Sequence, residues 1–129
     1  MKRDMDLIRR IALEVADMDF GYVLAGMRDK GIDDATFAMH VIWMKEAGLV
    51  AAAVQEYQSG EPPKVQVARL TWAGCEFVDA IRDDTLWAKA KSNVLKPGMS
   101  FTFDVLKDWL KTEITQGFPT TRALAQTSA

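Results

Sequence analysis

The residues best suited to chemistry in this sequence are one cysteine, one histidine and two pairs of adjacent aspartates. Cys75 and His40 lie 35 positions apart, a spacing that fits no zinc motif. They would act as a nucleophile and base only if the fold brought them within about 3 Å of each other. His40 falls near the apolar stripe of a predicted helix, which favours a packed histidine with a hydrogen-bonded nitrogen. Cys75 falls beside another apolar face, which favours a buried, inert thiol.

The carboxylate pairs at 33/34 and 83/84 come where helices are predicted to begin. Aspartate is a preferred N-cap, and neighbouring helical positions point apart, so neither pair is arranged as an acid/base couple. Glycines at 21, 26 and 31 have neither Walker nor dinucleotide spacing. The sequence therefore predicts no enzyme, no metal and no cofactor.

Composition limits the other classes of function. The chain has 129 residues, which fits one domain, and 49% are hydrophobic, enough for a core without disulfides or metal. With 18 acidic and 16 basic residues, the net charge of −2 attracts neither nucleic acid nor an anionic membrane. No apolar run approaches the roughly 20 residues that span a bilayer. The lone cysteine excludes an intrachain disulfide, and we expect a cytoplasmic protein.

Hydrophobic spacing and capping residues predict the elements that position these groups. Helices are expected over 4–17, 34–47, 72–82, 85–95 and from Ser100 or Thr102 to Ile114. A hairpin is predicted, with arms over Leu49–Tyr57 and Lys64–Leu70 on either side of Ser59-Gly60-Glu61-Pro62-Pro63. A short strand over 22–24 is a weaker expectation. Gly74 would let its helix lie close to the hairpin. We expect one domain over 1–117 and a loose tail over 118–129.

The order of these elements resembles a winged helix. "HVIWMKEAGLV" is similar to a recognition helix entering the first wing strand, and "ARLTWAGCEFV" to the return strand and next helix. With "MKRDMDLIRRI" and "SFTFDVLKDWL", these motifs resemble an uncharacterised bacterial and prophage family, domain of unknown function 2513, over about residues 1–112. The resemblance implies an α+β fold with a winged-helix-like core and two additional C-terminal helices. It implies no activity. The family usually has histidine after the glycine of "LTW.G", where this chain has Cys75.

Two kinds of partner follow from the winged-helix reading. DNA binding would use the 34–47 helix and the 49–70 wing, but residues 33–69 carry five acidic against three basic side chains. The candidate phosphate contacts are Arg9, Arg10, Lys45, Lys64 and Arg69. A protein partner or a homodimer is favoured instead, with Trp87 and Trp109 as possible interface anchors. Trp43 and Trp72, near the hairpin, are expected to support the core.

Overall fold

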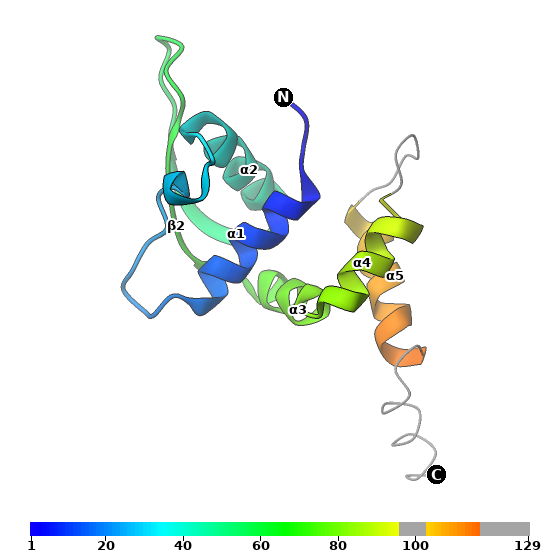
Figure 1. Cartoon of the computed structure of the whole chain (residues 1–129). Coiled ribbons are helices and arrows are strands. Elements are labelled where there is room, and N and C mark those ends of the chain that lie inside the picture. Colours follow the sequence, from blue (N-terminus) through cyan, green and yellow to red (C-terminus); the bar gives the residue numbers. More distant parts are fainter. Residues whose placement is uncertain (96–102, 117–129) are drawn as a thin grey trace. The chain divides into compact units, whose positions relative to one another are not determined.

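A computed structural model describes residues 1–95 and 103–116 of the chain. In these ranges the fold is α+β, with five α-helices, one short 3₁₀ turn and one antiparallel hairpin (Figure 1). Contacts divide the chain into two units, Met1–Val78 and Asp79–Ala129, and each is described here by itself. The single domain expected over 1–117 stays a prediction, and the predicted tail over 118–129 lies outside the described residues.

The first helix, α1 (Met5–Asp17), matches the prediction for 4–17. The Asp4 carboxylate caps it by accepting hydrogen bonds from the N–H groups of Asp6 (2.9 Å) and Leu7 (3.3 Å). Such a cap satisfies donors that the first turn leaves free. One stripe of the helix is buried and forms part of the core of the first unit: Leu7, Ile8, Ile11, Ala12 and Val15.

The strand expected over 22–24 is reduced to a single bridge. Leu24 exchanges both backbone hydrogen bonds with Val67, at 3.0 and 2.9 Å. The chain then makes the 3₁₀ turn η1 (Arg28–Lys30), which ends at Gly31 with a φ of 78°. Lys30 of this turn forms an ion pair with Glu14 of α1.

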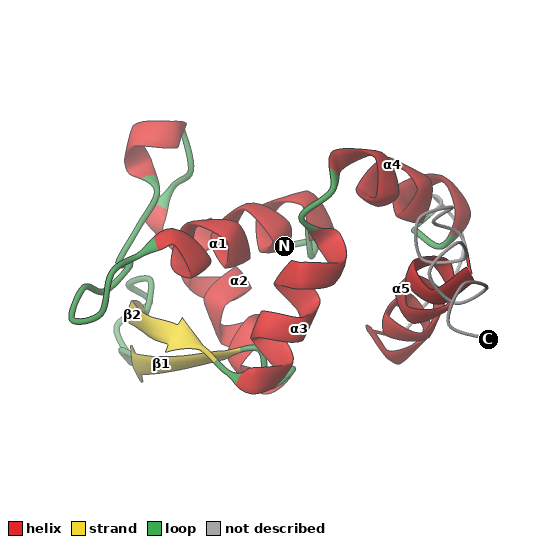
Figure 2. Ribbon diagram, turned by 90° about the horizontal axis from the view of Figure 1, so that it is seen from below, coloured by secondary structure: helices red, strands yellow, loops and turns green. Residues whose placement is uncertain are grey.

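The second helix, α2 (Asp34–Glu46), begins and ends at the predicted signals. The Asp33 carboxylate accepts a 2.8 Å hydrogen bond from the Thr36 N–H group. Gly48, just past the end, has a φ of 78°, a left-handed conformation that favours glycine. In Figures 1 and 2, α1 and α2 lie side by side against the hairpin, and contacts join both helices to its strands.

The hairpin consists of β1 (Val50–Gln55) and β2 (Lys64–Leu70), so its first arm is shorter than the predicted 49–57. Its register shifts between Ala51 and Ala52, where the partners change from Arg69 to Val67. Such a bulge bends the strand and increases its twist. Val65 and Val67 are buried while Lys64 and Gln66 are exposed, which is the alternation that the sequence predicted.

The third helix, α3 (Trp72–Ile81), starts where Thr71 was expected to cap it. The Thr71 hydroxyl accepts a 3.0 Å hydrogen bond from the Gly74 N–H group and donates one to the Gly48 carbonyl. A Cβ at position 74 would overlap the backbone oxygen of Leu49. The close approach predicted for Gly74 is therefore confirmed.

The second unit contains α4 (Asp84–Asn93) and α5 (Phe103–Gln116), which are in contact. Asp83 caps α4 by accepting a 2.8 Å hydrogen bond from the Leu86 N–H group. The helix predicted over 85–95 ends two residues earlier than predicted, at Asn93. The last helix continues past the predicted end at Ile114, to Gln116. Its predicted caps, Ser100 and Thr102, lie outside the described residues. The unit buries apolar side chains of both helices: Leu86, Trp87, Ala90, Val94, Leu106 and Leu110.

Candidate functional site: the outward face of the second helix

The histidine is a structural core residue, as predicted. His40 is 1% exposed, and both ring nitrogens are engaged. Nε2 accepts a 2.9 Å hydrogen bond from the Asp4 N–H group, so Nδ1 carries the proton and donates to the Thr36 carbonyl at 2.7 Å. Cys75 is exposed. With both nitrogens held by other groups, His40 is not arranged to activate this thiol.

The expectation that Cys75 is buried is wrong. The inward face of α3 consists of Gly74, Phe77, Val78 and Ile81, all buried and spaced three or four residues apart. Cys75 follows Gly74 by one position, about 100° around the helix, which takes it out of that face. The same geometry exposes Trp72, which is 82% accessible, so the prediction that this tryptophan supports the core is also wrong.

The other tryptophans differ in burial. Trp87 is 3% exposed, because α4 turns this side chain into the core of its unit. Trp109 on α5 is half-buried. Trp43 on α2 is half-buried as well and meets the His40 ring edge-on, with ring centroids 5.1 Å apart. The role of Trp87 and Trp109 at an interface stays a prediction.

The aspartates at 33 and 34 have separate structural roles. Hydrogen bonding from Thr36 lowers the pKa of Asp33 below its ordinary value. Asp34 accepts hydrogen bonds from the Arg28 guanidinium, with an Nε–Oδ1 distance of 2.8 Å, and this lowers the pKa of Asp34. These two pKa values move the same way, so the pair is not tuned as an acid and a base. Among the described residues, no group of three His, Cys, Asp or Glu side chains could hold a metal ion.

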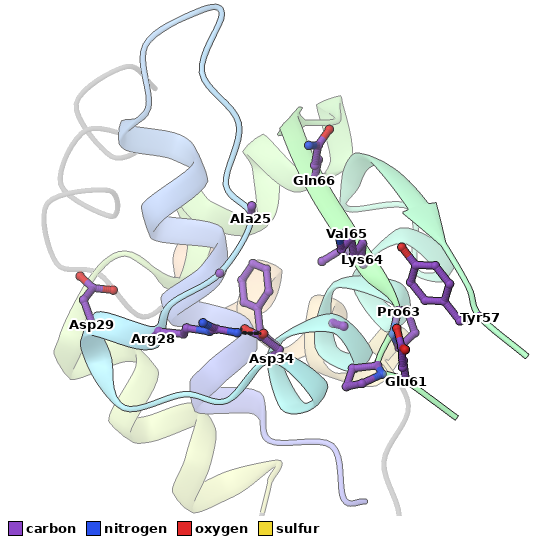
Figure 3. Close-up of a pocket in the computed structure, with 14 residues that line it drawn as sticks. Ala25, Arg28, Asp29, Asp34, Tyr57, Glu61, Pro63, Lys64, Val65 and Gln66 are labelled. Carbon is purple, nitrogen blue, oxygen red and sulfur yellow. Dashed lines mark hydrogen bonds and ion pairs between the residues drawn. The ribbon is translucent and has the colours of Figure 1, made fainter. Parts of the chain in front are cut away.

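An open cavity of about 630 Å³ lies between the 25–29 segment, the start of α2 and the base of the hairpin loop. Figure 3 shows the Arg28–Asp34 pair on one side and Tyr57, Glu61 and Pro63 from the hairpin on the other. Because Arg28 and Asp34 satisfy each other, the cavity presents no converging set of reactive groups. We therefore place the candidate site elsewhere on α2.

The unusual feature of α2 is that apolar side chains lie on its outward side as well as on its inward side. Its inward face is buried: Phe37, Ala38, His40, Val41 and Met44. The opposite side carries Ala35, Met39, Ile42 and Glu46, at spacings of four, three and four residues, and we call these four the outward strip. Ala35, Met39 and Ile42 are half-buried, and Glu46 is exposed. The outward strip therefore combines three partly accessible apolar side chains with one exposed carboxylate on a regular helix.

The basic side chains named as candidate phosphate contacts do not form one patch. Lys45 is exposed near the end of α2, about 16 Å along the helix from the Asp34 end that borders the cavity. Lys64 and Arg69 lie at opposite ends of β2, about 17 Å apart along the strand. Arg69 donates to the Leu70 carbonyl at 3.2 Å. On α1, Arg10 is exposed and Arg9 is half-buried.

No helix of the described residues combines the length and the apolar character needed to cross a membrane.

Sequence reasoning singled out α2 for its place in the chain but missed its outward strip. The signal was present, because Met39 and Ile42 are apolar at positions that face away from Phe37 and Val41.

Comparison with known proteins identifies a family but no function. Residues 2–100 match the family described as "Hypothetical protein (DUF2513)". An uncharacterized protein of Haemophilus influenzae is 32% identical over 117 residues, covering 90% of this chain and 98% of that protein. No solved structure matches. Neither description names an activity, a ligand or a partner.

Proposed function

We propose that this chain, which belongs to the hypothetical-protein family DUF2513, is a non-enzymatic interaction protein that binds a protein partner through the outward strip of α2. The observation that carries the proposal is the distribution of apolar side chains around α2. A surface helix normally has an apolar stripe and a polar opposite face, whereas a helix that is apolar on all sides is covered on all sides. In the described structure the core fully buries one side, and Ala35, Met39 and Ile42 on the opposite side are only half-buried.

The composition of the outward strip suits a protein surface. Met39 is flexible and polarisable, and such side chains adapt to partner surfaces. Trp43 flanks the strip, and tryptophan is enriched among residues that dominate binding energy. Ala35 is small and lets another backbone approach.

Lack of enzymatic activity is part of the proposal. It is supported by the use of the candidate groups: His40 joins Asp4 to Thr36, Asp33 caps α2, and Asp34 binds Arg28. Each of these groups has a structural partner that accounts for its presence.

A winged-helix-like core for the first unit is the second part of the proposal. The order α1, Leu24 bridge, η1, α2 and hairpin follows a winged helix in which the first strand is reduced to one residue pair and the second helix to one 3₁₀ turn. The antiparallel bridge from Leu24 to Val67 supports this reading, because it adds a third chain segment to the free edge of β2.

That fold analogy favours one alternative, DNA binding through α2 and the hairpin loop. Recognition in the major groove relies on Arg, Asn, Gln or similar side chains that face the bases. The outward strip has none of these, and two carboxylates stand at the start of α2, on its N-cap Asp33 and its first residue Asp34. Function is argued from the site rather than from the fold, so protein binding takes precedence.

The test uses affinity capture from a lysate of the native host, with and without nuclease. Captured proteins should survive nuclease and be lost with Ile42→Glu, which places a charge on the outward strip. Val23→Glu is the matched control, because Val23 is 51% exposed in the same unit but lies outside α2. Capture that both variants retain, or that nuclease abolishes, would contradict the proposal.

The DNA alternative is tested directly by fluorescence anisotropy with duplex DNA. We expect no binding at about 0.15 M salt, where phosphate contacts are already weakened. Sub-micromolar binding that Lys64→Ala or Arg69→Ala abolishes would favour DNA instead. In that case each lost phosphate contact should flatten the log–log salt slope by about 0.9.

A further inference from the structure

The edge of β2 that faces away from β1 is paired at one residue of the described structure. Leu24 exchanges both backbone hydrogen bonds with Val67, so the N–H and C=O groups of Val67 point away from β1. Backbone groups alternate between the two edges of a strand, so those of Val65, two residues earlier, point the same way. Val65 is 4% exposed, and no described residue hydrogen-bonds to either of its backbone groups.

The segment that could pair with Val65 leaves the strand before it reaches that residue. Continuing the antiparallel register from the Leu24–Val67 pair would set Gly26 opposite Val65. Instead, Met27 is buried and the turn η1 begins directly after it. The cavity of about 630 Å³ lies at this divergence, and both Gly26 and Val65 line it. Figure 3 shows Ala25 on the diverging segment and Val65 on β2 among the residues around the cavity.

We propose that this cavity binds an extended peptide, which takes the place opposite Val65 that Gly26 leaves and exchanges hydrogen bonds with the Val65 N–H and C=O groups. Addition of a strand to a free sheet edge is a general mode of peptide recognition. Buried backbone groups are nearly always paired, and such a ligand supplies both missing partners. Ligand cavities have volumes of about 300–1,000 Å³, so this one can hold a short peptide segment.

Apolar side chains should dominate the ligand. The cavity wall includes Phe37 and Ala38 of α2 and Tyr57, Pro62 and Pro63 of the hairpin loop. Successive side chains of an extended peptide point to opposite sides, so every second one can contact this apolar wall. We therefore expect the peptide to have apolar residues at alternate positions.

The charge of the cavity disfavours acidic peptides. Arg28 and Asp34 bind each other, so their charges offset. Of the other charged residues that line the cavity, Asp29 and Glu61 are acidic and Lys64 is basic. One cation against two carboxylates leaves a net charge of −1. The peptide is therefore expected to carry lysine or arginine beside its apolar residues.

Amide hydrogen exchange of the full chain, followed by NMR, tests the unpaired donor before any ligand is added. The N–H group of Gln66 points toward β1, where Gln66 is the partner of Ala53, whereas that of Val65 points into the cavity. We expect the Val65 amide to exchange at least about tenfold faster than the Gln66 amide. Equal protection of the two amides would overturn the inference.

Binding is tested with a displayed library of random seven-residue peptides, selected on the full chain. A synthetic peptide of an enriched sequence is then titrated by fluorescence anisotropy. Gly26→Leu should weaken its binding by about tenfold or more, because the new side chain enters the space that the peptide would occupy. A Cβ at position 26 meets nothing nearer than an Asp34 oxygen at 4.0 Å, so the change itself is accommodated. Ala53→Leu is the matched control, because Ala53 is exposed and does not line the cavity.

The site of binding is read from the same amide. The bound peptide should slow exchange at Val65 by about tenfold or more, and this readout needs no variant. The inference is independent of the proposed function, so Ile42→Glu should leave peptide binding unchanged. Circular dichroism establishes that each variant is folded. A library without enriched sequences, binding that Gly26→Leu leaves unchanged, or binding that does not slow exchange at Val65 would overturn the inference.

Discussion

The backbone N–H group of Asp4 donates a 2.9 Å hydrogen bond to Nε2 of His40, a residue 36 positions later in the chain. The single bond connects the N-cap of α1 to the middle of α2, and the other ring nitrogen holds the Thr36 carbonyl. The only histidine in the sequence therefore joins two helices.

Replacing this histidine should destabilise the first unit. His40→Leu removes both hydrogen-bonding nitrogens and leaves the Asp4 N–H group without its acceptor. We expect a loss of about 2–3 kcal/mol in the free energy of unfolding, measured by urea denaturation. Met39→Leu, one position away on the outward strip, is the control and should change the stability by less than about 1 kcal/mol. Equal effects of the two changes would contradict the role given to His40.

Gly74→Ala should be among the most damaging small substitutions in the chain. The new methyl group would overlap the Leu49 carbonyl oxygen, and backbone cannot move aside as a flexible side chain can. We expect a loss of about 3 kcal/mol or more in thermal or urea unfolding. Gly26→Ala is the matched control, because its Cβ would meet nothing nearer than an Asp34 oxygen at 4.0 Å. A Gly74→Ala variant as stable as the Gly26→Ala variant would refute the close approach of α3.

The capping aspartate at 33 should make stability depend on acid. Its pKa is lower in the folded chain than its ordinary value of 3.8, so the folded state favours the carboxylate. The stabilisation is therefore present above the unfolded pKa and is lost as the pH falls through the folded pKa. Asp33→Asn keeps a capping oxygen without the charge. Urea midpoints between pH 6 and pH 2 should show the gap between wild type and this variant closing at low pH.

Two tryptophans should respond in opposite ways to truncation. Trp72→Ala removes an indole that is 82% exposed and should change the stability by less than about 0.5 kcal/mol. Trp87→Ala removes one that is 3% exposed and should cost about 3–5 kcal/mol. Thermal unfolding followed by circular dichroism compares them. The reverse order would mean that α3 and α4 present other faces than those described.

Signals that act over one or two turns were read correctly from the sequence. Helices are capped by Asp33, Thr71 and Asp83. In each cap the side-chain oxygen accepts a hydrogen bond from an N–H group only three residues later in the chain. Family membership was also confirmed, although the match ends at residue 100 rather than about 112. These features need no knowledge of distant parts of the chain.

What the sequence could not supply was the direction of a helix face. In the described structure Leu24 bridges a single residue of β2, Val67, which lies 43 positions later in the chain. Cys75 and Trp72 are exposed because Gly74 fixes which side of α3 meets Leu49. The sequence of α3 alone does not say which side of the helix is buried. The contact between Gly74 and Leu49 decides that.

The Thr71 hydroxyl joins the turn that follows α2 to the first turn of α3, because the same oxygen donates to the Gly48 carbonyl and accepts from the Gly74 amide. The Thr71 N–H group meanwhile holds the Leu49 carbonyl at 2.9 Å. The end of α2 and the first turn of α3 therefore cannot open separately without breaking bonds to the same residue. In hydrogen exchange, the amides of Thr71 and Gly74 should open together as one cooperative segment. Threonine 71 thus makes the local motion of α3 depend on the integrity of the C-terminal end of α2.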